Sequence, residues 1–485
     1  MFVFILRIFE KLLIIYFLMY LVIDLGLYVY SLLIFIMKRK RKPDNTSYEG
    51  HKVSLLVPAY NEDVSIVHCT RMLLELDYPD FEVIVINDGS KDRTLDELLG
   101  NFDLVESGES NIMILETRKV KKTYRSHDGR LCLIDKENGG KADSINAGIN
   151  YAEGEFICTI DADSILDSGA LKDVVRPFLT DPATMVTGGQ LAAANDMVLV
   201  HNKVVSSKTP TNIWVQWQII EYIKSFMISR IGLSRINALL IMSGAFSLYR
   251  KSDLTAIGGF LTANNTDPYI TRTIGLGKHT VCEDMEIVVR LWQYKHDKKQ
   301  KARAVFLPEP VCWTEVPDNG RSLYKQRSRW HQGLAETLKI HRRMIFEPAY
   351  GVTGMIGLPY YFVFELFSPI VKVLTLVFIV LSAITGLINY QWAILMLFSV
   401  LLITAIILSS ITAIIENWSQ HQHAVSRDAL RYKGYGDWLK LMGAGILAEF
   451  TYSFYKIFAQ LNGLYNFMRG KSNWNKFARK GVRHI

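Results

Sequence analysis

Two aspartates stand two positions apart directly after a short apolar run, and their carboxylates could bind a hard divalent cation. Asp161 and Asp163 follow residues 156–160, a run typical of a buried strand. Carboxylate oxygens suit such a cation, which can in turn hold a diphosphate. Because an Asp-x-Asp triplet arises readily by chance, only its place at a strand end favours a metal and diphosphate site.

A second candidate is the segment Gln326-Arg327-Ser328-Arg329-Trp330. The two arginines offer guanidinium donors that suit phosphate oxygens, and the tryptophan offers a flat face on which a sugar ring can stack. The alternative is a basic helix on anionic lipid, with the tryptophan at the level of the headgroups.

A third candidate is the acidic pair Glu283 and Asp284, which opens a predicted helix over residues 285–292. A carboxylate here could be catalytic. However, carboxylates at a helix N-terminus are also stabilised by the helix dipole, so the pattern leaves both interpretations open.

The elements that must position these residues alternate between strand and helix. Short β-branched runs predict strands over residues 53–57, 81–86, 112–115 and 156–160, and apolar periodicity predicts helices over residues 62–76 and 141–152. This order predicts a doubly wound α/β sheet, whose ligands bind beyond the carboxyl ends of the strands. No Gly-x-Gly-x-x-Gly follows a predicted strand and the chain has no P-loop, which argues against a dehydrogenase and an ordinary ATPase.

The composition indicates an enzyme attached to a membrane more than an ordinary soluble one. Of the 485 residues 49% are hydrophobic and 21% charged, and the formal net charge is +8. These values exclude a disordered chain and a collagen, and they favour a membrane surface or an anionic substrate over nucleic acid. Five cysteines without a Cys-x-x-Cys pair indicate reduced thiols in a cytosolic domain.

The apolar excess divides the chain into three parts. Residues 12–37 are almost wholly apolar, and a bilayer is spanned by roughly 20 residues, so we predict a transmembrane anchor with a basic flank over residues 1–42. The basic run at residues 38–42 predicts that the following chain is cytoplasmic. Residues 43–350 then form a cytosolic domain.

The third part, residues 351–485, predicts a membrane region with interfacial helices and two or three spans. Residues 371–388 and 392–415 are long enough to cross a bilayer, and residues 355–368 predict an interfacial helix. Residues 441–461 carry polar side chains along one helical face, so they could lie in the interface, line a pore or span the bilayer. Residues 213–227 predict another amphipathic helix, placed equally well in the interface or on the soluble core.

The motifs occur in an order that resembles membrane-bound family 2 glycosyltransferases, which include poly-N-acetylglucosamine, hyaluronan and cellulose synthases. The resemblance covers residues 54–338 and implies a cytosolic GT-A domain, which is Rossmann-like, together with α-helical transmembrane segments. The motifs that carry it are Pro58-Ala59-Tyr60-Asn61-Glu62, Asn87-Asp88-Gly89-Ser90, Asn138-Gly139-Gly140-Lys141-Ala142, Asp161-Ala162-Asp163, Glu283-Asp284 and Gln326 to Trp330.

The resemblance also implies a role for each matching residue. Asp284 would be the general base, and Asp161 and Asp163 would hold Mg²⁺ or Mn²⁺. The nucleotide would be bound by Ala59, Tyr60, Glu62, Asp88, Lys141 and Asp161. The acceptor, the product and the leaving diphosphate would be framed by Glu283, Gln326, Arg327, Arg329 and Trp330. One departure from the family pattern is Cys282, which stands where many relatives have threonine.

Together these roles imply an inverting, processive glycosyltransferase of the cell membrane. It would build a β-linked extracellular polysaccharide from UDP-N-acetylglucosamine or UDP-glucose and pass it outward. The alternatives are transfer of one sugar to a lipid carrier and a non-catalytic nucleotide-binding membrane protein. The implied partners are the UDP-sugar, a growing polysaccharide or lipid acceptor, membrane lipid, and a small membrane subunit or a second copy of the chain. No nucleic acid is expected.

Overall fold

The computed structural model describes residues 2–37, 46–108, 113–200, 203–207, 209–386, 390–391, 394, 435–470 and 483–484. The basic run at residues 38–42 lies outside this part of the chain. The predicted span over residues 392–415 also lies outside it, apart from Ile394.

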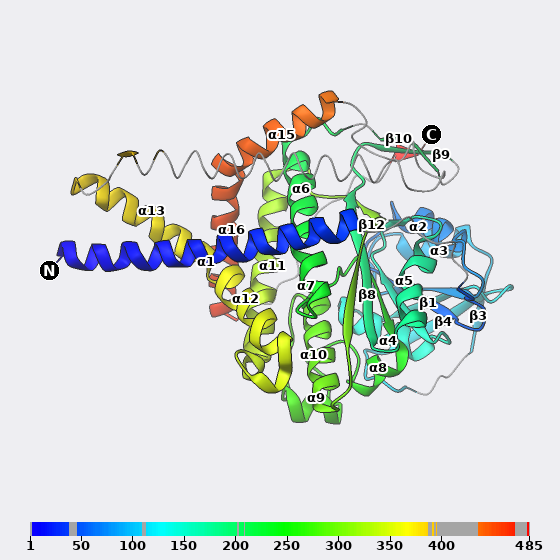
Figure 1. Ribbon diagram of the computed structural model, residues 1–485. Helices are drawn as coiled ribbons and strands as arrows, with labels where there is room; N and C mark the ends of the chain where they lie inside the picture. The colour runs from blue at the N-terminus through cyan, green and yellow to red at the C-terminus, as the bar shows by residue number, and fades with distance from the viewer. Residues whose placement is uncertain are drawn as a thin grey trace.

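One mixed sheet forms the centre of the described chain, with ten strands in the order β3-β4-β5-β2-β1-β6-β11-β8-β12-β7 (Figure 1). The central strands β5, β2, β1 and β6 are parallel, whereas β11 pairs antiparallel with both β6 and β8. The strands are β1 Val53–Ala59, β2 Phe81–Asn87, β3 Leu104–Ser107, β4 Val120–Ser126, β5 Leu131–Lys136, β6 Phe156–Ile160, β7 Ile165–Leu166, β8 Thr184–Ala193, β11 Phe246–Arg250 and β12 Arg303–Thr314.

The predicted strands at the centre are confirmed, but the one over residues 112–115 is wrong for its described part. Leu115 is buried, yet its backbone N–H and carbonyl are bonded by the side chain of Asn150 at 2.9 Å each, instead of by a neighbouring strand. The strands that follow β2 in the sheet, β5 and then β4, lie later in the sequence.

Helices cover this sheet: α4 packs against β1 and β2, and α5 packs against β8 and β12. Gly148 lets α4 approach closely, because a Cβ there would lie 2.9 Å from Leu56 Cδ2. The helices of this part are α2 Ile66–Leu74, α3 Thr94–Asn101, α4 Lys141–Tyr151, α5 Ala170–Thr180, α6 Ile213–Ile223, η1 Lys224–Arg230, α7 Ile231–Arg235, α8 Lys251–Ala256, α9 Pro268–Thr273, α10 Glu283–Asp297, α11 Gly320–Ile340, η2 Arg342–Met344 and η3 Pro348–Tyr350.

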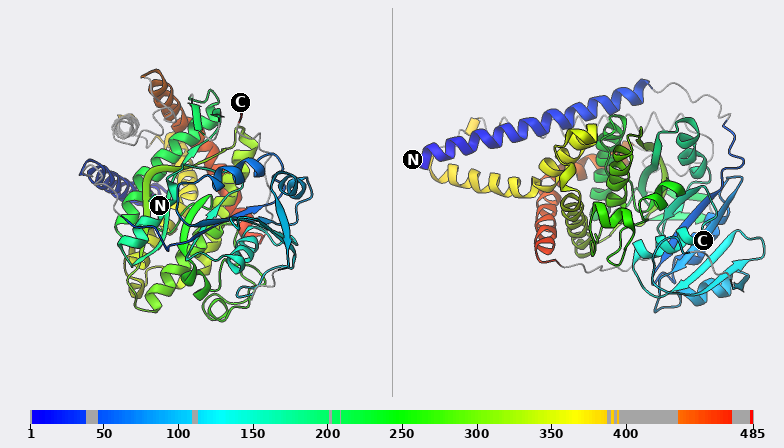
Figure 2. Two further views of the ribbon diagram at one scale, coloured as in Figure 1. Left: turned by 90° about the vertical axis from the view of Figure 1, so that its right-hand side faces the viewer. Right: turned by 90° about the horizontal axis from the view of Figure 1, so that it is seen from below.

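Two apolar helices project from the sheet domain on the same side (Figures 1 and 2). They are α1 (Phe2–Met37) and α13 (Ser368–Ile384), and they touch where the rings of Phe9 and Phe378 lie 5.9 Å apart. Among the described helices, α1 alone is long and apolar enough to cross a bilayer as one piece. The segment Thr353–Leu366 passes the same test only when it is joined to α13 across a bend of 43°.

The predicted interfacial helix over residues 355–368 is divided into the short pieces η4 (Thr353–Gly357), α12 (Leu358–Tyr360) and η5 (Tyr361–Leu366). The chain bends before α13, which has Pro369 in its first turn. Proline lacks a backbone N–H and therefore suits the start of a new helix better than the continuation of an old one.

The segment over residues 441–461 is divided between two helices, α15 (Tyr435–Phe450) and α16 (Tyr452–Met468), so the prediction of one continuous helix is wrong. The break falls at Thr451, whose backbone leaves the helical region with φ −126° and ψ −66°. Both helices pack on the sheet domain, α15 against α6 and α16 along α11.

The amphipathic helix predicted over residues 213–227 packs on protein on both sides. Its regular part is α6, which contacts β8 and α15. Trp217 donates a hydrogen bond to Ala444 O at 3.1 Å, and its ring stacks on that of Tyr452 with 5.5 Å between centroids. The sequence left two positions open for this helix, in the membrane interface or packed on the core. The structure supports the packed position.

The C-terminus also returns to the sheet domain. A small sheet is formed by β9 (Met197–Val200), β10 (Lys203–Ser207) and β13 (Arg483–His484), in the order β10-β9-β13. β13 pairs parallel with β9, so residues 483–484 lie against a hairpin of the sheet domain.

The close contact between α11 and α16 predicts a sensitive position at Gly463. A Cβ there would lie 2.3 Å from Ser328 O and 3.0 Å from Gln332 N, both backbone atoms of α11. We expect Gly463→Ala to destabilise the protein by about 1–3 kcal/mol through overpacking, measured as a lower Tm in detergent. Gly443→Ala in α15 is the control, because nothing lies within 4 Å of a Cβ there. Equal Tm values for the two variants would contradict the packing argument.

Candidate active site

A cavity of about 710 Å³ lies at the carboxyl ends of the parallel strands and extends to α11 and α16. Most of the predicted site residues line it: Ala59, Tyr60, Glu62, Asp88, Lys141, Asp161, Glu283, Asp284, Gln326, Arg329 and Trp330. Asp163 and Arg327 do not line it. Residues from 59 to 330 thus converge on one cavity because β1, β2, β6, α4, α10 and α11 all point an end or a face toward it.

A lysine between two carboxylates forms the centre of the cavity. Lys141 Nζ lies 2.7 Å from Asp161 Oδ1 and 3.1 Å from Glu283 Oε1, and it donates to Gly244 O at 3.0 Å. Burial lowers the pKa of Lys141, but the charges of Asp161 and Glu283 outweigh burial and raise it. Lys141 is therefore a permanent cation in an acidic site.

Asp284 lies at the first turn of α10, beside this cluster. Its Oδ2 accepts a hydrogen bond from Gly244 N at 3.0 Å, and its Oδ1 accepts one from Met285 N at 2.9 Å. Burial and the neighbouring charge of Glu283 raise the pKa of Asp284 to about 6, against the opposing effect of Lys141. A carboxyl group with this pKa is suited to accept a proton near neutral pH.

Asp163 is buried behind the cavity wall, where its Oδ2 lies 3.5 Å from the hydroxyl of Thr314. Within the described ranges no group of three or more His, Cys, Asp or Glu side chains is arranged to hold a metal ion. The carboxylate chemistry of both residues suits a cation such as Mg²⁺, which commonly binds through one or two carboxylates and completes its shell with substrate phosphates and water, but only Asp161 lines the cavity.

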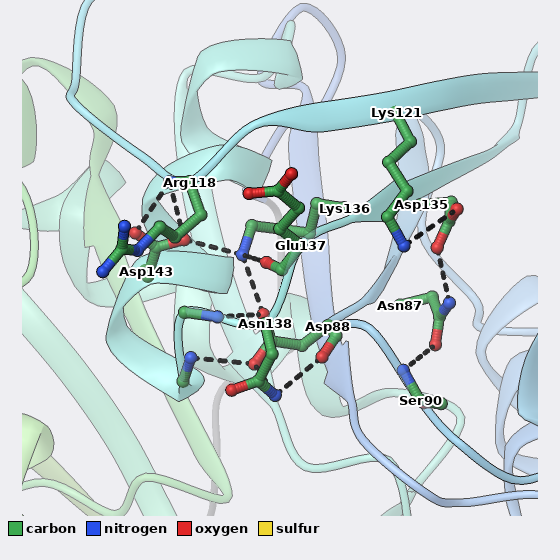
Figure 3. A network of polar contacts seen from close by, with 12 residues as sticks. Asn87, Asp88, Ser90, Arg118, Lys121, Asp135, Lys136, Glu137, Asn138 and Asp143 are labelled. Carbon is green, nitrogen blue, oxygen red and sulfur yellow. Dashed lines mark hydrogen bonds and ion pairs between the residues drawn. The ribbon is translucent and has the colours of Figure 1, made fainter.

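Asp88 lines the cavity, but its carboxylate is occupied by neighbouring donors (Figure 3). Oδ1 accepts from Lys136 Nζ at 2.7 Å and from Gly139 N at 2.9 Å, and Oδ2 accepts from Gly140 N at 2.8 Å and from Asn138 Nδ2 at 3.1 Å. The resemblance implies that Asp88 binds the nucleotide. In the structure both of its oxygens hold the loop that leads into Lys141.

The same network contains two residues that the sequence interpretation missed (Figure 3). Lys136 is fully buried at the end of β5 and lies 2.6 Å from Asp143 Oδ1 as well as beside Asp88. Asp143 also accepts from Arg118 N at 3.0 Å. A lysine at the end of a run that begins with four apolar residues was the available signal, since a buried ammonium needs carboxylate partners.

Arg327 departs from its predicted role. Its guanidinium donates to Glu221 Oε2 from Nη2 at 2.6 Å, and it lies outside the cavity lining, so a contact with the diphosphate is not what the structure shows. Arg329 and Trp330 do line the cavity. The alternative in which Trp330 lies among lipid headgroups is therefore not supported.

The C-terminal helix α16 also contributes to the cavity, which the sequence did not reveal. Tyr455, Asn462 and Asn466 line it beside the α11 residue Tyr324. Asn462 donates to Ser328 Oγ at 2.9 Å, which ties α16 to the middle of the Gln326 to Trp330 segment. Two asparagines four positions apart in an aromatic-rich helix were the only hint, because i and i+4 share one face.

Cys282, the departure from the family pattern, is buried against α11. A Cβ on Gly333 would lie 2.2 Å from its Sγ, so the two helices are in close contact here. Burial raises the pKa of the Cys282 thiol well above its usual range. The cysteine is therefore a packing residue that leaves Glu283 and Asp284 in place.

An acidic cavity with a half-buried carboxylate of raised pKa, at the carboxyl ends of strands in a mixed α/β sheet, fits a sugar-nucleotide transferase. Residues 51–333 match the model of the family described as Glycosyltransferase like family 2, and the chain belongs to this family.

Relatives with assigned names are similar over the same region. The poly-beta-1,6-N-acetyl-D-glucosamine synthase of Staphylococcus epidermidis is 28% identical over 298 residues, which cover 61% of this chain and 57% of the relative. The synthase of the same name from Staphylococcus aureus (strain COL) is 28% identical over 298 residues, or 61% of this chain and 58% of the relative. The chain thus spans little more than half the length of these relatives.

Among solved structures, the mannosyltransferase PcManGT from Pyrobaculum calidifontis, in complex with GDP-Man and Mn²⁺, has a TM-score of 0.51. It is 17% identical, and the match covers 96% of this chain and 99% of that chain. This likeness supports the GT-A fold.

Proposed function

We propose that the chain is an inverting, processive glycosyltransferase that adds sugars from UDP-N-acetylglucosamine or UDP-glucose to a β-linked polysaccharide at the cell membrane. The observation that carries this proposal is one cavity lined by an acidic cluster suited to the nucleotide, a half-buried carboxylate suited to act as base, and an aromatic ring suited to the acceptor. Asp161 and Lys141 form the first, Asp284 is the second and Trp330 is the third.

Asp284 takes the proton of the attacking acceptor hydroxyl as the new glycosidic bond forms. Its raised pKa keeps it basic enough for this transfer. Glu283 is paired with Lys141, so it does not act as a second, nucleophilic carboxylate. A single displacement at the sugar carbon inverts its configuration, and an α-linked donor gives a β-linked product.

Lys141 and Arg329 act on the leaving diphosphate. Both are cavity cations, and fixed positive charge where negative charge develops lowers the barrier to departure of UDP. Asp161 and Asp163 would hold Mg²⁺ or Mn²⁺, which when bound supplies further positive charge to the same phosphates.

The acceptor end of the cavity belongs to α11 and α16. Trp330 is 38% exposed and offers its ring to a sugar, while Gln326 and the α16 amides offer hydrogen bonds to hydroxyl groups. An acceptor that stacks on Trp330 presents its terminal hydroxyl toward Asp284. The growing polysaccharide is therefore the acceptor that we propose, with membrane lipid and a small membrane subunit or second copy as further partners.

For the membrane we propose a multi-pass arrangement with a cytoplasmic catalytic domain. α1 is the N-terminal span, and the chain that leaves along α13 has returned to the catalytic domain at α15. The pairing of β13 with β9 supports a C-terminus on the side of the catalytic domain.

Topology reporters test this arrangement. We expect reporters fused after residue 42 and after residue 485 both to read cytoplasmic, and one placed before residue 4 to read extracytoplasmic. Alkaline phosphatase and green fluorescent protein fusions provide the two opposite signals. An extracytoplasmic C-terminus would make α15 and α16 a crossing and would contradict their packing on α6 and α11.

Product sizing tests the function. Membranes that contain the protein are incubated with radiolabelled UDP-sugars, and the products are separated by gel filtration before and after lipid extraction. A long polymer supports the proposal. A single sugar on a lipid would favour the lipid-carrier alternative, and the absence of transfer from every UDP-sugar would favour a non-catalytic protein.

A further inference from the structure

We propose that Tyr452 of α16 and Glu221 of α6 are positioning residues for the acceptor, because together they hold Arg327 against Gln326 and Trp330. This inference rests on the proposed function, since it gives the two residues a part in the acceptor end of the same cavity.

Arg327 contacts two cavity residues that flank it in α11. Its Nη1 donates to Gln326 Oε1 at 2.6 Å, and its Cζ lies 4.2 Å from the centroid of the Trp330 ring. A charge-assisted hydrogen bond fixes the amide, and a cation–π contact restrains the indole. Arg327 itself is buried, with 4% of its surface exposed. It therefore affects the acceptor through Gln326 and Trp330 and not by direct contact.

Glu221 and Tyr452 in turn fix Arg327. Glu221 Oε2 accepts from Arg327 Nη2 at 2.6 Å and from Nε at 3.2 Å, and the Tyr452 hydroxyl donates to the same oxygen at 2.7 Å. The Tyr452 oxygen also accepts from Arg327 Nε at 3.2 Å. Lys456 Nζ lies 3.3 Å from Glu221 Oε1. Because the guanidinium is a rigid fork, these contacts determine its orientation.

Helix packing alone does not require these charges. The ring of Tyr452 already stacks on Trp217 at 19° between planes, and α15, α16 and α6 share other apolar contacts. Removing charges from water is costly, and well-packed apolar residues often stabilise an interface equally well. We infer that the charged contacts serve orientation. They make the rotamers of Gln326 and Trp330 depend on the position of α16.

The first test uses Tyr452→Phe, which removes one hydroxyl and keeps the ring stack. We expect the KM for an oligosaccharide acceptor to rise roughly tenfold, the effect of losing one hydrogen bond to a charged group. The KM for the UDP-sugar, its slow hydrolysis by water and the Tm should remain unchanged. Tyr465→Phe is the matched control, since it removes an exposed hydroxyl from the same helix outside the cavity.

A second variant extends the series to the carboxylate. Glu221→Gln should raise the acceptor KM further, and the double variant should be no worse than Glu221→Gln alone, because both residues act through Arg327. Equal losses of hydrolysis, transfer and Tm in Tyr452→Phe would show a structural role only and would overturn the proposal.

A readout without turnover separates this inference from the proposed function. The nine tryptophans are labelled as 5-fluorotryptophan, and the Trp330 resonance is assigned by its loss in Trp330→Phe. We expect this resonance to shift or broaden in Tyr452→Phe and not in Tyr465→Phe. An unchanged resonance in Tyr452→Phe would overturn the positioning role, whereas a parent protein that transfers no sugar but shows the shift would refute only the function.

Discussion

Asp284→Asn is expected to lower the rate of sugar transfer by about 10²–10⁴ while binding of UDP persists, because the change removes a general base but little volume. The ion pairs of Lys141 with Asp161 and with Glu283 do not involve the Asp284 side chain. Initial rates of labelled sugar incorporation measure the first effect, and calorimetric titration with UDP measures the second.

Asp297→Asn is the control for this experiment, since it makes the same chemical change at the other end of α10. It should leave both transfer and UDP affinity unchanged. If Asp284→Asn instead weakens UDP binding and keeps its turnover, Asp284 is a nucleotide or metal ligand and the base assignment falls.

The pH dependence of the parent enzyme provides a second measure of the same group. The pKa of Asp284 is raised to about 6 by burial and by Glu283, and is held from rising further by Lys141, the Gly244 N–H and Arg230. Only the deprotonated carboxylate accepts a proton, so kcat/KM should fall as the pH drops through about 6. A profile that stays flat down to pH 4 would contradict this assignment.

The strands at the centre of the fold could be predicted because a buried parallel strand can be recognised from its own short apolar run. β1, β2 and β6 are short, mostly apolar runs, and β2 and β6 are each followed directly by an acidic residue, Asp88 and Asp161. The place of β4 and β5 could not be predicted, since the sheet order is set by long-range pairing. The strand predicted over residues 112–115 had the right composition, but in its described part Asn150 bonds the backbone of Ile114 and Leu115 instead of a neighbouring strand.

The site was predicted where a motif supplied the chemistry and missed where partners come from distant segments. Asp161, Asp284 and Trp330, whose roles the resemblance to the family implies, line the same cavity. Arg327 looked like a phosphate ligand because nothing local shows that Glu221, 106 positions earlier, is its partner. The contribution of α16 is equally distant, since Tyr452 meets Glu221 across 231 positions.

The second large effect that we expect concerns the departure of the UDP leaving group, whereas Asp284→Asn affects the attacking hydroxyl. We expect Asp161→Asn to lower transfer by about 10³ or more, because it removes a carboxylate from the proposed cation site and the charge stabilisation there amounts to several kcal/mol. EDTA should abolish transfer by the parent enzyme, and excess Mn²⁺ or Mg²⁺ should restore it. Asp103→Asn, at an exposed carboxylate of the same domain, should change neither result.

Lys141 makes this experiment decisive between two arrangements. Its ammonium already lies 2.7 Å from Asp161, so it could by itself supply the positive charge that UDP needs to depart. Mn²⁺ binding measured by electron paramagnetic resonance in the presence of UDP distinguishes the two without turnover. If Asp161 and Asp163 hold the cation, Asp161→Asn loses Mn²⁺ binding in step with activity. If the parent binds no Mn²⁺ and works fully in EDTA, Lys141 alone serves the diphosphate, and Asp161 acts by orienting that lysine.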